Sequence, residues 1–185
     1  MTLRTTLLLM LAAWGSDMRG KTFLQKNAYF MSKLLGEDLG FRPHYYGPYS
    51  PKLEMALGEL RGMGIVSESV STFGVVDSAG FQRKRYDYSL TADGRHVANA
   101  IQGDLKVESE AIDMAVKKIK RAGGDMGYWS LAVAAKTHFV ISASGSSLSE
   151  QDVVDRAEGF GWDVDEKQVC EATEFLGRLE LIARD

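Results

Sequence analysis

The chain has 185 residues, of which 45% are hydrophobic and 25% are charged, so it can bury a core as one domain or as two small ones. Its single cysteine, Cys170, excludes an intrachain disulfide and favours a reducing, cytoplasmic compartment. No apolar segment approaches the roughly 20 residues that a membrane-spanning helix needs, so we expect no membrane partner.

The formal net charge of −3 is unevenly distributed. Residues 1–100 carry 12 Lys and Arg against 9 Asp and Glu, whereas residues 101–185 carry 10 against 16. A mildly basic first part is therefore joined to an acidic second part.

Apolar residues at helical spacing predict two helices near the N-terminus, over residues 2–14 and 21–36. Gly15 and Gly20 bracket a loop between them. A short extended segment, 41–46, is expected after the second helix.

The next stretch begins a third helix at Pro51. Ser50 is well placed as its N-cap, and proline at the first helical position has a preset backbone angle and no hydrogen-bond donor to lose. The predicted buried stripe of this helix is Leu53, Leu57 and Leu60.

Residues 64–90 contain two extended runs around a glycine-containing turn, which predicts a β-hairpin, or wing. Thr91 then caps a long helix that reaches Ile119, with a possible break at Gly103.

Three further helices are predicted in the acidic part. The first covers about residues 128–141, the second begins at Ser147 with Glu150 as a capping box, and the third begins at Asp163 with Glu166. The apolar residues of the last two are expected to dock on the long helix or on a second copy of the chain, which makes a homodimer one possibility.

This order of elements is that of a winged helix-turn-helix domain. We therefore expect a mainly α protein with a small β-wing: a winged helix-turn-helix domain over residues 1–100 and a helical extension over 101–185. The extension is either simply helical or a second helix-turn-helix-like unit.

Two motifs resemble a known family. The segments KTFLQKNAYF and YYGPYSPKL are similar to the YwgA-like family of uncharacterised prokaryotic proteins and, more distantly, to Panacea antitoxin domains. The matching positions are Lys21, Leu24, Gln25, Lys26, Tyr29, Tyr46, Gly47, Pro48, Ser50 and Pro51. The resemblance implies a winged-helix fold, and in Panacea-type proteins the domain neutralises toxins by protein contact.

Cationic side chains suggest a surface for duplex DNA. The candidate nucleic-acid-binding residues are Lys52, Arg61, Arg83, Lys84 and Arg85. The last three form a cationic segment of the wing that could lie against phosphates while the third helix enters a groove. The alternative is a solvated hairpin tip, and Glu54 and Glu59 leave the third helix neutral.

The corner before the third helix holds Tyr45, Tyr46 and Tyr49, which are the candidate partner-binding residues. These rings either stiffen the entry to the helix by packing on Tyr29 and Phe30, or present a low-entropy patch to a protein partner.

Nothing in the sequence indicates catalysis. His44, His96 and His138 lie far apart without metal-ligand spacing, and His138 in an apolar helix suits a hydrogen-bonded core histidine. We expect a non-enzymatic protein without metal or other cofactor. Its predicted function is that of a DNA-binding regulator, and the alternative is a protein-binding antitoxin or adaptor module that uses the aromatic corner and the acidic tail.

Overall fold

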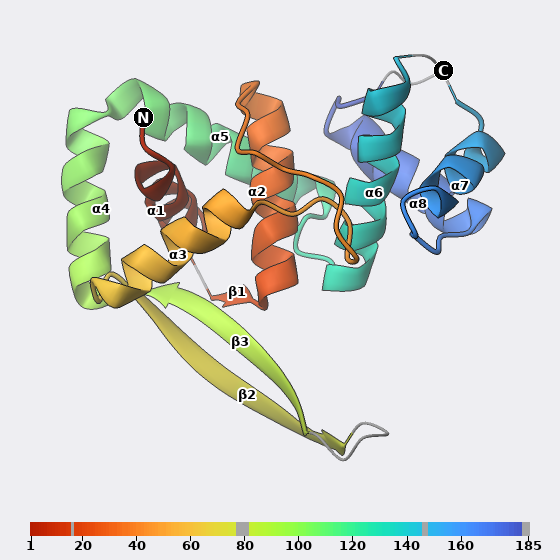
Figure 1. Cartoon of the computed structure of the whole chain (residues 1–185). Coiled ribbons are helices and arrows are strands. Elements are labelled where there is room, and N and C mark those ends of the chain that lie inside the picture. Colours follow the sequence, from red (N-terminus) through yellow and green to blue (C-terminus); the bar gives the residue numbers. More distant parts are fainter. Residues whose placement is uncertain (16, 77–81, 146–147, 183–185) are drawn as a thin grey trace.

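The structure, a computed structural model, describes residues 1–15, 17–76, 82–145 and 148–182, with the backbone alone at 73–76, 82 and 83. The chain is mainly helical with one small three-stranded antiparallel sheet (Figure 1). In chain order the elements are α1 (Leu3–Trp14), β1 (Met18–Arg19), α2 (Lys21–Leu35), α3 (Pro51–Gly62), β2 (Val66–Val76), β3 (Gln82–Leu90), α4 (Ala92–Asp104), α5 (Lys106–Ala122), α6 (Tyr128–Ser144), α7 (Glu150–Glu158) and α8 (Glu166–Arg178).

The sheet has the order β1-β3-β2, with β3 in the centre. Val66 pairs with Leu90 near the helices, and Met18 of β1 pairs with Tyr88. The rest of the β2–β3 hairpin extends away from the helical body (Figure 1). The predicted wing hairpin is confirmed as a pair of strands.

The short strand was expected in the wrong place. The sequence suggests an extended segment at 41–46 and a loop between Gly15 and Gly20, but β1 lies within that loop. In the segment after α2, Arg42 and Tyr49 form only an isolated bridge. A two-residue strand carries no local signal, because its pairing with β3 is decided by tertiary structure.

The start of α3 agrees with the prediction. The Leu53 backbone N–H donates to Ser50 Oγ at 3.1 Å, and Pro51 occupies the first turn. Leu57 and Leu60 are buried with Leu53, and α3 packs on α1. Hydrophobic spacing and cap chemistry therefore identify both the start and the inner face of this helix.

The long helix predicted after the wing is divided in two. Thr91 is its cap as expected, since Thr91 Oγ1 accepts from the Gly94 N–H at 2.9 Å. The break lies at Leu105, between α4 and α5, close to the suggested Gly103. The second half, α5, packs on both α1 and α2.

The predicted capping residues of the last two helices are wrong by two positions. Ser149 caps α7 in a capping box with Asp152, and Asp165 caps α8 with Gln168. The predicted cap Ser147 lies outside the described residues. With Ser149 as the cap, Val153 is one of the α7 residues turned into the core.

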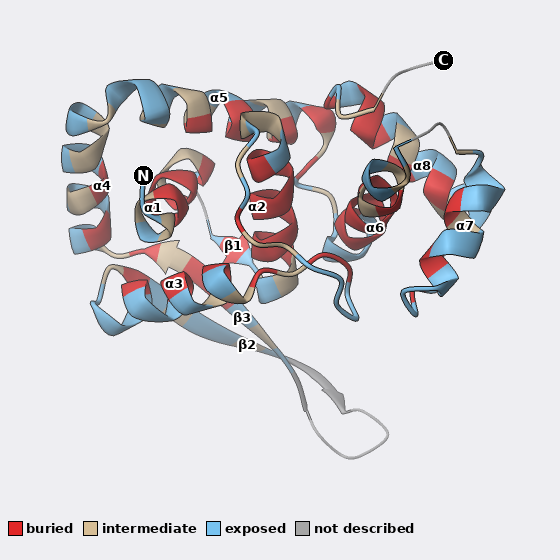
Figure 2. Cartoon of the chain, turned by 45° about the horizontal axis from the view of Figure 1, so that its top comes forward, coloured by how far each residue is buried: buried red, intermediate tan, exposed pale blue. Residues whose placement is uncertain are grey.

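The acidic tail docks on the chain itself. Its helices α7 and α8 pack mainly on α6, and α8 also reaches the end of α5, where Arg178 bonds to the Ala122 carbonyl. Trp162, Val169 and Leu176 are buried. Buried residues follow α1, α2 and α6 through the middle of the molecule, whereas α4 and α7 expose their outer faces (Figure 2). One continuous cluster of buried apolar residues runs from Leu7 to Leu179. The division at residue 100 stays a prediction.

Candidate functional site

The two motifs that carry the family resemblance contact each other. Gln25 Nε2 donates to the Ser50 carbonyl at 3.1 Å, and the Ser50 N–H donates to Gln25 Oε1 at 3.0 Å. Lys26 Nζ donates to the Pro48 carbonyl at 2.6 Å. All four residues are buried. The polar residues of α2 thus clamp residues 42–50, which we call the corner.

The corner is also held by its own backbone and by α6. Arg42 and Tyr49 exchange two backbone hydrogen bonds of 3.0 and 2.9 Å. Gly47 has φ of 85°, which favours glycine, and a Cβ there would lie 3.0 Å from Lys136 Cγ and 3.3 Å from the Ala132 carbonyl oxygen. Only a glycine lets the corner approach α6 this closely.

The three corner tyrosines do not act as one patch. Tyr45 and Tyr46 form an edge-to-face pair with centroids 4.8 Å apart, and both are exposed. Tyr49 is half-buried, and its ring lies 4.9 Å from that of His44. Between α2 and α3, the ring that packs on Tyr29 is that of Phe41, just before the corner, with the centroids 5.2 Å apart.

The C-terminal part supports the corner from the other side. Trp162 Nε1 donates to the His44 carbonyl at 2.7 Å, and Phe160 stacks on Trp162 with centroids 4.9 Å apart. Phe139 of α6 packs edge-on against both rings. This contact joins residues 118 positions apart in the chain, and no local signal could have predicted it.

The segments that meet at this junction carry four exposed rings: Tyr45 (73% exposed), Tyr46 (46%), Trp129 (48%) and Phe160 (41%). We call them the aromatic surface. Trp129 belongs to it because Lys136, which contacts Gly47, has its Nζ 5.7 Å from the Trp129 ring centroid. Sequence reasoning missed Trp129, whose neighbours do not link it to the corner.

Two lysines lie beneath the corner. Burial lowers the pKa of Lys26 to about 7, and the positive charge of Lys136 adds to the effect. Burial also lowers the pKa of Lys136, while Asp163 opposes that shift. Near neutral pH the charged and uncharged forms of Lys26 therefore coexist, and both can donate to the Pro48 carbonyl.

A second buried polar contact joins α2 to α6. The Tyr29 hydroxyl lies 2.7 Å from His138 Nδ1. Burial raises the pKa of Tyr29 and lowers that of His138 to about 4, with Lys33 contributing to the latter. The imidazole is therefore neutral, and the tautomer of His138 decides which of the two groups donates this hydrogen bond. This bears out the prediction of a core histidine with a hydrogen-bond partner.

The cationic residues suggested for DNA do not form one free cluster. Arg85 makes two bonds to the Asp87 carboxylate, 2.7 Å from Nε and 2.8 Å from Nη2. Arg61 pairs with Glu68 at 2.6 Å. Both guanidinium charges are neutralised within the protein. The pairing of Arg85 with Asp87 could have been predicted from the sequence, because residues two apart on a strand lie on the same face.

The remaining candidates are Lys52 of α3, which is exposed, and Lys84 and Arg83 of β3. Lys84 is exposed on the opposite side of the strand from Arg85. The side chain of Arg83 lies outside the described part of the chain. On α3, Glu59 pairs with Arg4 at 3.3 Å and Glu54 with Lys21 at 2.6 Å. The solvent face of α3 is thus close to neutral and also exposes Met55.

Within the described ranges, no three His, Cys, Asp or Glu side chains gather closely enough to hold a metal ion. No described helix combines the length and the apolar character needed to cross a membrane. In comparisons with known proteins, neither a family model nor a curated sequence matches the chain.

Proposed function

We propose that this chain is a protein-binding module of winged-helix type, without catalytic activity, that captures a basic segment of a partner protein on the aromatic surface. The order α1-β1-α2-α3-β2-β3 and the sheet order β1-β3-β2 support a winged helix. The connection from α2 to α3, residues 36–50, is longer than the usual three- or four-residue turn. That extra length is the corner.

The observation that carries the proposal is the exposure of four aromatic rings on an anchored backbone. Large aromatic side chains are normally buried, and at binding surfaces they contribute a large contact area for little loss of side-chain entropy. Here the bonds of Gln25, Lys26 and Trp162 hold the corner in place before any partner arrives. A surface ordered in advance loses less entropy on binding.

The surrounding charge favours a basic partner. Asp155, Glu158 and Asp163 are exposed on either side of Phe160. Residues 149–185 carry 11 Asp and Glu against 4 Lys and Arg. Carboxylates beside aromatic rings suit arginine, which stacks on ring faces and pairs with carboxylates. The same carboxylates repel nucleic-acid phosphates on this side of the molecule.

The test is a selection of random peptides of about 12 residues on the immobilised full chain. Selected peptides should be rich in arginine and aromatic residues. Tyr45→Ser and Trp129→Ser should each weaken their binding by roughly tenfold or more, as for residues at the centre of an interface. The matched control is Tyr86→Ser, since Tyr86 is a similarly exposed tyrosine on β3.

The proposal would be contradicted if Tyr86→Ser weakened peptide binding as much as the other two changes. It would also be contradicted if none of the three changes affected the binding of the selected peptides. Selection of acidic peptides would contradict the charge argument. Circular dichroism of each variant verifies that the fold is retained.

Binding of duplex DNA by the wing and α3 is the second candidate, supported by the exposed ammonium groups of Lys52 and Lys84. Changing Lys52, Arg83 and Lys84 together to serine should weaken DNA binding at low salt. It should also flatten the plot of log affinity against log salt by about 0.9 for each phosphate contact removed. Arg85→Ser should change the slope little, because Asp87 already neutralises it. A wild-type chain that shifts no duplex at low salt eliminates this candidate.

A further inference from the structure

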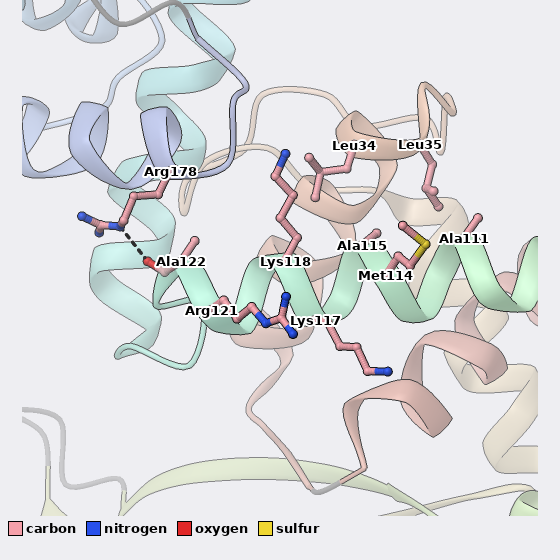
Figure 3. Close-up of a pocket in the computed structure, with 10 residues that line it drawn as sticks. All are labelled: Leu34, Leu35, Ala111, Met114, Ala115, Lys117, Lys118, Arg121, Ala122 and Arg178. Carbon is pink, nitrogen blue, oxygen red and sulfur yellow. Dashed lines mark hydrogen bonds between the residues drawn. The ribbon is translucent and has the colours of Figure 1, made fainter.

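A groove lies on the other side of the molecule from the wing, where α2, α5 and α8 meet. Its volume is about 900 Å³. Figure 3 shows Leu34 and Leu35, at the end of α2, above the α5 side chains Ala111, Met114 and Ala115. These five residues make the floor apolar.

Four other residues that line the groove are cationic. Lys117, Lys118 and Arg121 come from the last turns of α5, and Arg178 comes from α8. Arg178 is held in place by a 3.0 Å bond from Nε to the Ala122 carbonyl (Figure 3). The residues that line the described groove include no Asp or Glu, although Asp113, Glu174 and Glu180 beside it each pair with one of its cations. An apolar floor with a cationic rim fits an acidic amphipathic ligand.

The ion pairs at the rim can be exchanged. Lys118 pairs with Glu180 at 2.6 Å and Lys117 with Asp113 at 2.6 Å, both in exposed positions. Exposed pairs contribute little to stability, so carboxylates of a partner can replace these at small cost. Arg121 has no acidic partner among the described residues. Glu180 shows that a carboxylate at this rim reaches Lys118.

The groove is continued by a stripe along α5. Val107, Ala111, Met114, Lys118 and Arg121 follow one another at spacings of three and four and so share one face of the helix. Val107 is 77% exposed and Met114 is 70% exposed. At about 1.5 Å per residue the stripe spans roughly 20 Å, which is about four turns of a helix. A compact small molecule would leave most of that length uncovered.

We propose that this groove binds an acidic amphipathic helix of a partner protein. Its apolar residues, at i, i+4 and i+7, pack between Met114 and the two leucines of α2, and its carboxylates pair with the cations at the end of α5. The residues that line the groove come from α2, α5 and α8, whereas the rings of the aromatic surface come from the corner, α6 and the segment after α7. The proposal for the groove therefore does not depend on the function proposed above.

The probe is a fluorescein-labelled helical peptide of about 15 residues made of Ala, Leu and Glu, with leucines at i, i+4 and i+7 and glutamates flanking them. A matched peptide has lysine in place of every glutamate. Fluorescence anisotropy measures the binding of each to the full chain. The acidic peptide should bind with a dissociation constant below about 1 mM, and the basic one at least tenfold more weakly.

Three variants of the protein complete the test. Met114→Ser should weaken the acidic peptide by roughly tenfold, as expected for removing a buried apolar anchor. Met55→Ser, which alters a methionine 67% exposed on α3, should leave binding within about twofold. The double change Lys118→Glu with Arg121→Glu should reverse the order of the two peptides, so that the basic peptide binds more tightly.

The proposal is overturned if the acidic peptide fails to bind at about 1 mM, if both peptides bind alike, or if Met55→Ser weakens binding as much as Met114→Ser. Laurate is the competitor for a lipid-like occupant. If laurate binds the groove and the acidic peptide does not, the assignment to a helix is overturned.

Discussion

The clamp between Gln25 and Ser50 allows a quantitative test of how the corner is held. Gln25→Met keeps the size of the side chain but removes both hydrogen bonds to the Ser50 backbone. The Ser50 carbonyl retains a bond from the Glu54 N–H at 3.2 Å, so only the Ser50 N–H is left without a partner. Because Ser50 is fully buried, water cannot replace the lost acceptor.

An orphaned buried N–H costs about 1 to 3 kcal/mol, and the second lost bond about 1 kcal/mol more. Gln25→Met should therefore lower the free energy of unfolding by about 2 to 4 kcal/mol, a large part of the 5 to 15 kcal/mol that is typical of a domain. Urea denaturation followed by circular dichroism measures this change through the transition midpoint, provided that the slope is unchanged.

Gln151→Met is the matched control, since Gln151 is exposed on α7 and bonds only to the neighbouring Asp155 side chain. It should cost less than about 0.5 kcal/mol. A Gln25→Met chain that loses no more than this control would refute the idea that the α2 motif holds the corner. The variant should also bind peptides selected on the aromatic surface more weakly, because the corner is then less ordered.

Three further outcomes are expected. Lys26 has a folded pKa of about 7 and an ordinary value of 10.5, so the unfolded chain binds a proton there that the folded chain lacks. Stability should consequently rise with pH between about 7 and 10, by at most about 1.4 kcal/mol per pH unit from Lys26. Lys26→Met should remove this contribution and leave only the part that comes from Lys136. Leu57→Ala should lower the free energy of unfolding in urea by about 2 to 5 kcal/mol, because Leu57 is a buried residue of α3, which packs on α1. Trp162→Phe should cost about 1 kcal/mol in the same assay, since it removes the indole bond to His44 but keeps most of the ring packing.

The first two of these outcomes have a control variant in the chain. Lys52→Met, at an exposed lysine, should keep the pH dependence that Lys26→Met loses. Met55→Ala, on the exposed side of α3, should change stability by less than about 0.5 kcal/mol, in contrast to Leu57→Ala. A Trp162→Phe chain as stable as the wild type would show that the bond to His44 does not anchor the C-terminal part.

Local rules predicted several element ends correctly. Ser50 with Pro51 marks the start of α3, and Thr91 marks the start of α4, because cap hydrogen bonds reach only two or three residues along the chain. The same rules misplaced the caps of α7 and α8, where Ser149 and Asp165 compete with equally suitable residues two positions earlier. Local chemistry proposes such alternatives, and packing against α6 decides between them.

The sequence by itself thus determined the helical segments, the hairpin and the inner face of α3, since each rests on periodicity or on contacts within a few residues. Only the tertiary structure decided what the motifs are for. Gln25 and Ser50 are 25 residues apart, and Trp162 and His44 are 118 apart, so their pairing leaves no trace in local spacing. Tertiary packing also placed β1, turned Tyr45 outward while Tyr49 is half-buried, and brought Trp129 beside the corner. The reason is physical: side-chain direction and long-range contacts depend on how whole helices pack, which the order of residues along one segment does not specify.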